Sequence, residues 1–426
     1  VQGLAQAKEG YASVWLVGGE SGVGKTRLVE EFRIQALVDG WQVIHGQAIE
    51  DGRQEYQLWQ DVVPTLALNC SLSDLEIGVL SETFPQLESL LARVVSRPSQ
   101  LSGKDMQQRL IMTLASTLQR QVRPTLLILE DLHWAHESLT VVNQVIKILS
   151  ELPSVMIIGT YRLDERPQLH QTLSGAKTLA LSRLNNEQIQ ELARLMLGKE
   201  YVTSGLISLL SKETEGNTFF IVEVMRAFVE EAGHMMTIED KSLPTHVFTG
   251  GMANLLQRRL NKVKGEDKKL LQLAAVAGRQ FDLQLLSRLK LDLNISEFLQ
   301  RLSELAIVTI QDGRWLFSHD KLRQATLNQL SAQRHQEVHR QVASEIEKLY
   351  PDQPQYNFVL LEHWQAARDE QKELHYLLPV VKQLIEISAD YDRGHMLASR
   401  ALTLLPANAP RRVILLNQQA DAYFFQ

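Results

Sequence analysis

Short continuous runs of apolar residues mark the first half of the chain, whereas apolar residues recur at helical spacing through most of the second half. Strands are predicted at the apolar runs 14–17, 42–46, 125–129, 155–158 and 178–181. The runs at 125–129 and 155–158 show no polar alternation, which is typical of strands buried on both faces. Because helical patterns separate the strands, we expect a parallel sheet with right-handed crossovers.

Helical periodicity predicts the elements between and after these strands. A helical insertion is expected at about 54–120, between the second and third strands. After the last strand, Asn185 and Gln188 have the spacing of a capping box, which predicts the start of a helix that runs to residue 196. The first helix is expected at 26–38, with a buried face formed by Leu28, Val29, Phe32 and Val38.

The rest of the chain is predicted to be helical apart from one hairpin. Asp312-Gly313 joins two β-rich runs, at 308–311 and 314–318, and is a strong hairpin signal. Three helices before this hairpin complete the pattern of a winged helix. After residue 333 the helical pattern continues to the end, and the small residues of 394–406 favour a helical-hairpin repeat. The remaining helices are expected at 206–214, 219–230, 246–260, 267–277, 281–289 and 295–305.

Composition excludes several classes of protein. The chain has 426 residues and a formal net charge of −6, so no overall positive field favours DNA or an anionic membrane, and we do not expect this region to bind DNA. Cys70 is the only cysteine, the 12 histidines lack zinc-site spacing, and no segment has the pattern of a signal peptide or a membrane span. We therefore expect a cytoplasmic protein.

The strongest chemical signal lies at residues 19–26, which read Gly-Glu-Ser-Gly-Val-Gly-Lys-Thr and match G-x-x-x-x-G-K-S/T directly after the first predicted strand. Glycines let successive N–H groups converge on phosphate oxygens, and the following helix directs its positive end at the same anion. Lys25 is expected to reach the β- and γ-phosphates and Thr26 to hold Mg²⁺. The candidate nucleotide ligands are Gly19, Ser21, Gly22, Val23, Gly24, Lys25, Thr26 and Arg27.

Two carboxylates follow the most apolar strand. Glu130 and Asp131 stand at its carboxyl end, where parallel sheets bind ligands, so one is expected to approach Mg²⁺ and the other to orient the attacking water. Which of the two lies nearer the metal stays open. A helix start rich in acidic residues is the alternative explanation.

Arg162 ends the next strand and is expected at the same sheet edge as Lys25 and Glu130. A guanidinium there is suited to contact the γ-phosphate and so distinguish ATP from ADP. The alternative is an arginine that pairs with Asp164 or Glu165.

We expect a multidomain α/β plus α protein, in keeping with about 150 residues per domain. Its predicted parts are a parallel-sheet P-loop ATPase core at 1–183 with the insertion at about 54–120, a helical lid at 184–262, a winged helix at 263–332, and TPR-like helical repeats at 333–426. Since the chain begins with Val1 and ends in what reads as an interrupted helix, we also expect sequence beyond both ends.

Together these motifs resemble the STAND class of AAA-related signalling ATPases. The most specific part of the resemblance is Leu-Glu-Asp-Leu-His-Trp-Ala at 129–135, and the likeness extends through the Gly-Asn-Thr at 216–218 to about residue 350. Such modules occur beside bacterial adenylate or guanylate cyclases, Ser/Thr kinases and in large transcriptional activators. The resemblance implies a core, lid and winged helix that close over a nucleotide.

The resemblance also implies a function and further residues. Family members switch between a closed ADP state and an open, often oligomeric ATP state. His319 in Phe-Ser-His-Asp resembles the histidine that contacts the β-phosphate of ADP, the alternative being a helix-start histidine bonded within its own domain. Thr218 stands where family members have a proline that packs near adenine, so this chain departs from the family pattern there.

Three functional hypotheses follow. The first is a slow, Mg²⁺-dependent ATPase that uses ATP and ADP to control an attached output domain or signalling partner, with an ATP-dependent homo-oligomer expected. The second is a DNA-binding, initiator-like AAA+ protein with a winged helix. The third is a scaffold that retains ADP without useful turnover.

Overall fold

The computed structural model describes residues 7, 9, 11–49, 56–95, 103–135, 138–148, 154–198, 202–234, 251–289, 293–311, 313–388 and 390–425. The chain divides into two compact units. Unit 1 comprises Val1–Gly19, Lys25–Ala180 and Asp352–Gln426, and unit 2 comprises Glu20–Gly24 and Leu181–Pro351. Residues Glu20–Gly24 of the phosphate loop therefore belong to the same compact unit as the residues that follow the sheet.

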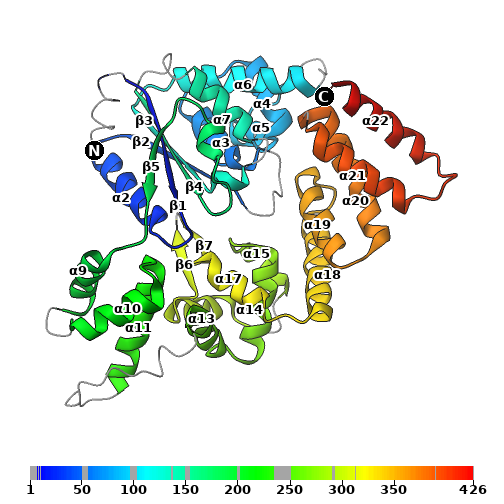
Figure 1. Cartoon of the computed structure of the whole chain (residues 1–426). Coiled ribbons are helices and arrows are strands. Elements are labelled where there is room, and N and C mark those ends of the chain that lie inside the picture. Colours follow the sequence, from blue (N-terminus) through cyan, green and yellow to red (C-terminus); the bar gives the residue numbers. More distant parts are fainter. Residues whose placement is uncertain are drawn as a thin grey trace. The chain divides into compact units, whose positions relative to one another are not determined.

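Unit 1 is built on a five-stranded sheet with the strand order β2-β3-β4-β1-β5 (Figure 1). The pairs β1–β4, β2–β3 and β3–β4 are parallel, as the alternation of strands and helices predicts. In the register, Gly19 pairs with Arg162 and Gln47 pairs with Glu130. The strands are β1 (Ser13–Gly19), β2 (Gln42–Gln47), β3 (Thr125–Glu130), β4 (Val155–Arg162) and β5 (Lys177–Leu181).

Helices cover the sheet, which explains the continuous apolar strands. All six residues of β3 are buried, and all of β4 except Arg162. Alternate strand residues, among them Leu127 and Ile157, pack into one core with the helices of the insertion and with α7 (Ser138–Lys147). The central strands are thus buried as predicted, whereas β5 is largely exposed.

Helix α2 (Lys25–Val38) follows the phosphate loop and confirms the predicted first helix. Val29 and Ala36 are buried in it. The inclusion of Val38 in its buried face was wrong, since Val38 is 77% exposed. Val38 is the last helical residue, directly before the turn at Gly40 that leads into β2, so it extends past the packed part of the helix.

The predicted helical insertion is present within the described residues between β2 and β3. A capping box of Ser73 and Glu76 starts one of its helices, and Trp59 and Phe84 are among its fully buried side chains. The remainder of unit 1 includes the short helix α8 (Leu169–Thr172) after β4. The insertion consists of η1 (Gln57–Trp59), α3 (Val62–Leu68), α4 (Asp74–Thr83), α5 (Gln86–Leu90) and α6 (Gly103–Gln119).

The C-terminal helices of unit 1 pack in sequence order, as expected of helical hairpins. Small residues at Gly394, Ala398 and Ala401 form a buried face of α21, and the predicted small-residue helix therefore lies against its neighbours. A side chain at Gly394 would lie 2.6 Å from Ile385 Cγ1, so glycine permits the close approach. The elements are η5 (Pro354–Tyr356), α19 (Asn357–Ala366), α20 (Glu370–Gln383), η6 (Leu384–Ser388), α21 (Tyr391–Leu404) and α22 (Arg411–Phe425).

Unit 2 begins with the predicted lid helices. Asn185 and Gln188 form the expected capping box at the start of α9. The predicted interruption at Gly216 and Asn217 separates α10 from α11. The first five residues of the helix expected at 246–260 lie outside the described residues. The region predicted to be a lid, called the lid below, contains α9 (Asn186–Leu197), α10 (Ser204–Thr214), α11 (Thr218–His234) and α13 (Gly251–Asn261).

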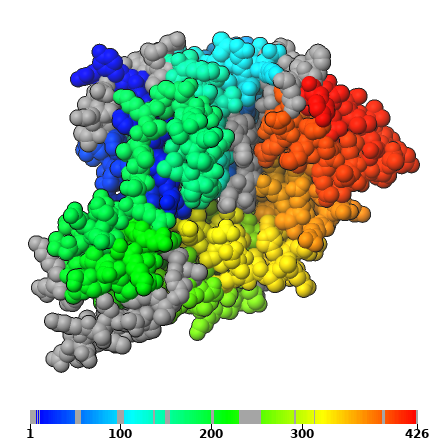
Figure 2. Space-filling model, viewed as in Figure 1, coloured from blue at the N-terminus to red at the C-terminus, as the bar shows by residue number. Residues whose placement is uncertain are grey.

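Three helices and an antiparallel hairpin follow, which is the arrangement of a winged helix. Asp312 of the predicted turn lies outside the described residues, while Gly313 has a φ of 75°. In the space-filling view the green lid and the yellow winged helix meet (Figure 2). The elements are α14 (Gly265–Ala277), α15 (Leu283–Leu289), α16 (Ile295–Glu304), β6 (Val308–Gln311), β7 (Arg314–Phe317), α17 (Asp320–Leu327) and α18 (Ala332–Leu349).

The predicted fold class is confirmed: a parallel sheet covered by helices is joined to a largely helical remainder of the chain.

Candidate nucleotide-binding site

The phosphate loop connects the end of β1 at Gly19 with the start of α2 at Lys25. Gly22 and Gly24 have φ angles of 88° and 106°, a backbone region that glycine adopts at little cost. The Lys25 ammonium is buried and donates to the Gly19 carbonyl at 2.8 Å, which holds it beside the loop. The N-terminus of α2 and this cation together are suited to bind an anion.

The two residues after Lys25 differ from the loop in exposure. Thr26 is exposed, so its hydroxyl is accessible to a ligand or metal. Arg27 forms an ion pair with Glu31 one helical turn away, and its side chain is 79% exposed. Arg27 is therefore placed on the solvent side of α2.

Within unit 2, the segment between α10 and α11 is hydrogen-bonded to the phosphate loop. Asn217 Nδ2 donates to the Ser21 carbonyl at 2.9 Å. The Phe219 N–H donates to the Gly22 carbonyl at 2.9 Å. The Thr218 hydroxyl donates to the Val23 carbonyl at 3.3 Å. Three successive loop carbonyls thus accept hydrogen bonds from three successive lid residues.

Arg183 adds a charged contact to the same loop. Its guanidinium donates two hydrogen bonds to Glu20, at 2.7 and 3.0 Å, and also pairs with Glu215. Hydrogen bonds with Glu20 and Glu215 raise the pKa of Arg183. Because all three side chains are substantially exposed, this bridge contributes more to the orientation of these side chains than to the stability of the fold.

His319 lies next to this segment. Its imidazole stacks on the Phe219 ring, with centroids 3.8 Å apart and planes 16° apart. His319 Nδ1 accepts a hydrogen bond from the Lys321 N–H at 3.1 Å and so caps α17. The helix-start bond that the sequence analysis gave as the alternative is therefore present, together with a stack that connects His319 through Phe219 to the loop.

In unit 1, both carboxylates at the end of β3 are buried and held by side chains of β2. His45 Nε2 donates to Glu130 Oε2 at 2.8 Å, and Gln47 Nε2 donates to Asp131 Oδ2 at 3.0 Å. Burying a carboxylate is unfavourable unless such partners satisfy it. His45 and Gln47 stand two residues apart on β2 and so present both donors on one face.

Asp131 has an unusual backbone conformation. Its φ of 58° lies in the left-handed region, which costs of order 1 kcal/mol for a residue other than glycine. The Asp131 N–H donates to the Thr160 hydroxyl at 3.1 Å, which ties the end of β3 to β4. Since β4 separates β3 from β1, the carboxylates stand about 10 Å, two strand spacings, from the strand that carries the phosphate loop.

Arg162 ends β4 opposite Gly19, as predicted, but its guanidinium is already engaged. It pairs with Glu165 and lies 4.7 Å from the ring centroid of Trp134. Trp134 Nε1 also donates to Glu165 Oε2 at 3.0 Å. The Glu165 partner left open as the alternative is therefore present.

The donor set suits Mg²⁺ rather than a metal held by protein alone. The described residues contain no group of three or more His, Cys, Asp and Glu able to hold a metal ion. Mg²⁺ bound with a nucleotide needs only one or two protein oxygens, because phosphates and waters complete its coordination. The exposed hydroxyl of Thr26 and the buried carboxylates of Glu130 and Asp131 fit that requirement.

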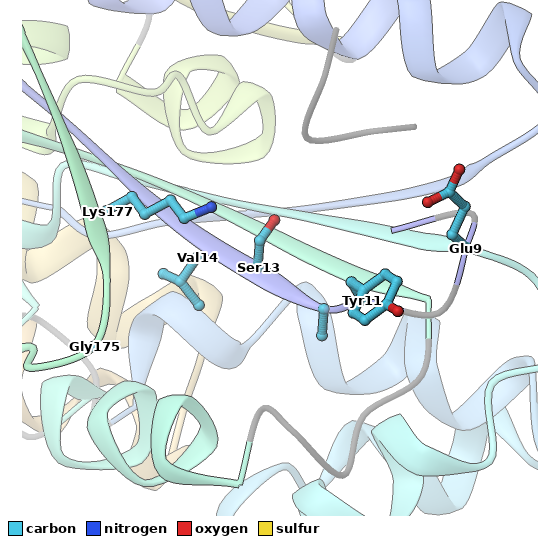
Figure 3. A pocket seen from close by; sticks show the side chains of 7 residues that line it. Glu9, Tyr11, Ser13, Val14, Gly175 and Lys177 are labelled. Atoms are coloured by element: carbon cyan, nitrogen blue, oxygen red, sulfur yellow. The ribbon is translucent and has the colours of Figure 1, made fainter. Parts of the chain in front are cut away.

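A separate pocket of about 420 Å³ lies at the opposite end of β1 (Figure 3). Six residue steps along β1 separate it from the phosphate loop, or about 20 Å. None of the predicted site residues lines this pocket. The lining residues are Glu9, Tyr11, Ala12, Ser13, Val14, Gly175 and Lys177.

Residues 2–158 match the family model of the AAA ATPase domain. This part of the chain is therefore similar to an ATP-binding, AAA-type P-loop ATPase domain. Comparison with curated proteins gives no match. No helix in the described part of the chain combines the length and apolar character needed to cross a membrane.

The fold is similar to that of a STAND (signal transduction ATPase with numerous domains) protein with a tetratricopeptide repeat sensor from Pyrococcus horikoshii. The alignment has a TM-score of 0.55 at 16% identity and covers 99% of this chain. This chain spans only 60% of that protein's chain. The predicted resemblance to STAND-class ATPases is thus confirmed at the level of the fold.

Two further structures align less well. A Walker-type ATPase of Pyrococcus abyssi has a TM-score of 0.33 at 14% identity, with coverage of 76% of this chain and 93% of its own. Drosophila ORC bound to DNA has a TM-score of 0.31 at 14% identity, with coverage of 76% and 91%. At such scores neither alignment favours a particular function, and the initiator-like hypothesis gains no support from them.

Several residues of the site were not predicted from the sequence. His45 and Gln47 are polar residues in alternate positions near the end of β2. This pattern could have indicated that they contact polar groups of the neighbouring strand. The resemblance assigned no role to Asn217 itself, whereas the structure shows its amide bonded to the phosphate loop. Nothing local marks Arg183 as a partner of Glu20, which lies 163 residues away.

Proposed function

We propose that this protein is a regulatory ATPase whose nucleotide state controls an output domain or signalling partner. The observation that carries the proposal is the set of hydrogen bonds between the lid segment 217–219 and loop residues Ser21, Gly22 and Val23, with His319 stacked on Phe219. A change at the loop thereby reaches both the lid and the winged helix. A ligand shifts such an equilibrium only by its preference for one state.

In this proposal Mg²⁺ accompanies ATP. Thr26 and one of the two carboxylates would hold it, and the ion would neutralise charge that develops on the phosphates. The other carboxylate is suited to orient the attacking water, because His45 or Gln47 holds it in place. Slow turnover suits a protein that reports which nucleotide it holds.

We expect His319→Ala to weaken ADP binding about tenfold while ATP binding changes less than threefold. The physical reason is that the imidazole, next to the loop through Phe219, is proposed to contact the β-phosphate in the closed ADP state, and a charge-assisted hydrogen bond contributes about 1.5–3 kcal/mol. Isothermal titration calorimetry with each nucleotide measures the difference.

His335→Ala is the matched control. His335 belongs to α18 in the same unit, and its ring neighbours that of His339. Its change to alanine removes an imidazole from this unit but leaves the stack of His319 on Phe219 intact. Equal losses of ADP and ATP affinity in His319→Ala would count against the latch.

We expect Glu130→Gln and Asp131→Asn each to reduce ATP turnover at least about tenfold while leaving ADP affinity within threefold. Both changes preserve size and remove a charge that acts on the metal or the water. The variant that also requires more Mg²⁺ for half-maximal turnover identifies the residue nearer the metal. Unchanged turnover in both variants would refute the catalytic role of this pair.

Mass spectrometry of the purified protein for retained ADP, followed by a turnover assay, separates the switch from an ADP-locked scaffold. Retained ADP with no measurable hydrolysis would favour the scaffold.

Light scattering in ATP and in ADP tests the proposed ATP-dependent homo-oligomer.

A further inference from the structure

The lid segment meets the phosphate loop through hydrogen bonds to the backbone rather than through side-chain packing alone. In a trans peptide unit the C=O and the N–H point in opposite directions. The carbonyls of Ser21, Gly22 and Val23 share their peptide units with the N–H groups of Gly22, Val23 and Gly24. Donors that hold these carbonyls toward the lid therefore direct the N–H groups away from it, where the motif requires them to meet phosphate. The Val23 N–H makes a long bond of 3.5 Å to the Glu20 carbonyl within the loop, and a bound phosphate would compete with that carbonyl for it.

The loop conformation agrees with this arrangement. Successive carbonyls in an extended chain alternate in direction, whereas residues that alternate between right- and left-handed conformations bring successive N–H groups to one side, where they can bind an anion. Gly22 and Gly24 supply the left-handed conformations, with φ angles of 88° and 106°. A side chain at Gly22 would also lie 2.7 Å from Asn217 Oδ1. Gly22 is thus required both by its conformation and by the closeness of the asparagine.

Asn217 has a defined amide orientation because both ends of its side chain are used. The residue is 3% exposed. Its Oδ1 accepts from the Phe220 N–H at 3.4 Å, in the first turn of α11, which leaves Nδ2 as the donor to Ser21. An aspartate in this place would keep the helix-capping oxygen but set a carboxylate against the Ser21 carbonyl.

We propose that Asn217, assisted by Thr218, is a positioning residue that orients the N–H groups of the phosphate loop for the phosphates of a nucleotide. The inference rests on the proposed nucleotide binding and adds a role that differs from contact with adenine. Thr218 supports it, because its hydroxyl donates to the Val23 carbonyl, a bond that a proline in this position could not make.

The test compares Asn217→Asp with Asn185→Asp. Asn185 caps α9 in the same unit through its Oδ1, so its change to aspartate preserves a cap without touching the loop. We expect Asn217→Asp to weaken ADP binding at least about tenfold in calorimetry, with Asn185→Asp within twofold of the wild type. Because Asn217 is buried, a carboxylate against the Ser21 carbonyl is also expected to lower the thermal midpoint of Asn217→Asp, whereas Asn185→Asp keeps the wild-type midpoint.

Hydrogen exchange at saturating ADP separates positioning from a general loss of structure. In the wild type, ADP is expected to protect the amides of residues 20–26. In Asn217→Asp these amides should exchange faster although the site is saturated, while helix α11 keeps its protection. Weakened affinity with unchanged loop protection, or unchanged affinity, would overturn the inference.

If Asn217→Asp fails to fold, Thr218→Val replaces it, with an expected loss of about threefold in ADP affinity because one neutral hydrogen bond is removed. Wild-type protein that binds neither ADP nor ATP would refute the proposed function itself. Wild-type binding combined with unaffected variants would refute only the positioning role.

Discussion

Lys25→Ala is expected to abolish ATP and ADP binding measurable by calorimetry. The Lys25 ammonium is the buried cation of the phosphate loop and now donates to the Gly19 carbonyl at 2.8 Å. A bound phosphate would replace that neutral acceptor with an anion, so that the ammonium gains an ion pair in addition to its hydrogen bond. Removal of the Lys25 ammonium also leaves the negative phosphates without their nearest cation. We therefore expect nucleotide affinity to fall by more than about 100-fold.

Lys177→Ala is the appropriate control for this change. Lys177 lies on β5 in unit 1, where its ammonium stands 5.3 Å from the Trp15 ring centroid and lines the pocket at the far end of β1. We expect wild-type affinity for both nucleotides in this variant. Nucleotide affinity retained by Lys25→Ala would refute the assignment of residues 19–26 as the binding loop.

Gly216→Ala is expected to lower the free energy of unfolding of unit 2 by about 3 kcal/mol or more. The Leu184 N–H donates to the Gly216 carbonyl at 2.8 Å, which joins the segment after β5 to the segment before α11. Gly216 has a φ of 79°, and a methyl group there would lie 2.2 Å from the Leu184 carbonyl oxygen. Backbone must move to accept it, and Asn217 would move with it.

Gly265→Ala separates backbone conformation from this clash. Gly265 is in the same unit, has a φ of 59°, and has no atom within 4 Å of an added side chain. Its change to alanine should cost only about 1–2 kcal/mol, the penalty of the left-handed region. Heat-induced unfolding, followed together with limited proteolysis of the lid, compares the two variants. Equal midpoints for both would show that the contact with Leu184 has no effect on stability.

The strands were predictable because a strand buried on both faces needs an unbroken apolar run, which β3 provides. The prediction that Val38 is buried was wrong, because helical spacing gives the direction of a side chain but not whether a neighbouring element extends far enough to cover it. For Arg162 the sequence left a ligand and an ion pair open, and the structure shows the pair with Glu165.

By itself the sequence determined the phosphate loop, the order of strands and helices, the capping box at Asn185, and the position of the carboxylates at the end of β3. Each of these depends on residues that are close together in the chain, where backbone geometry and periodicity act directly. The roles of His319 and the carboxylates stay predictions for the experiments above.

Only the tertiary structure decided which distant side chains meet. Glu130 is held by His45, Asp131 by Gln47, and the Ser21 carbonyl by Asn217, with 84 to 196 residues between partners. Hydrogen bonds act over about 3 Å, and local composition does not indicate which distant partners meet. The phosphate loop was therefore identifiable from its own eight residues, whereas the groups that orient it became evident only once the chain had folded around it.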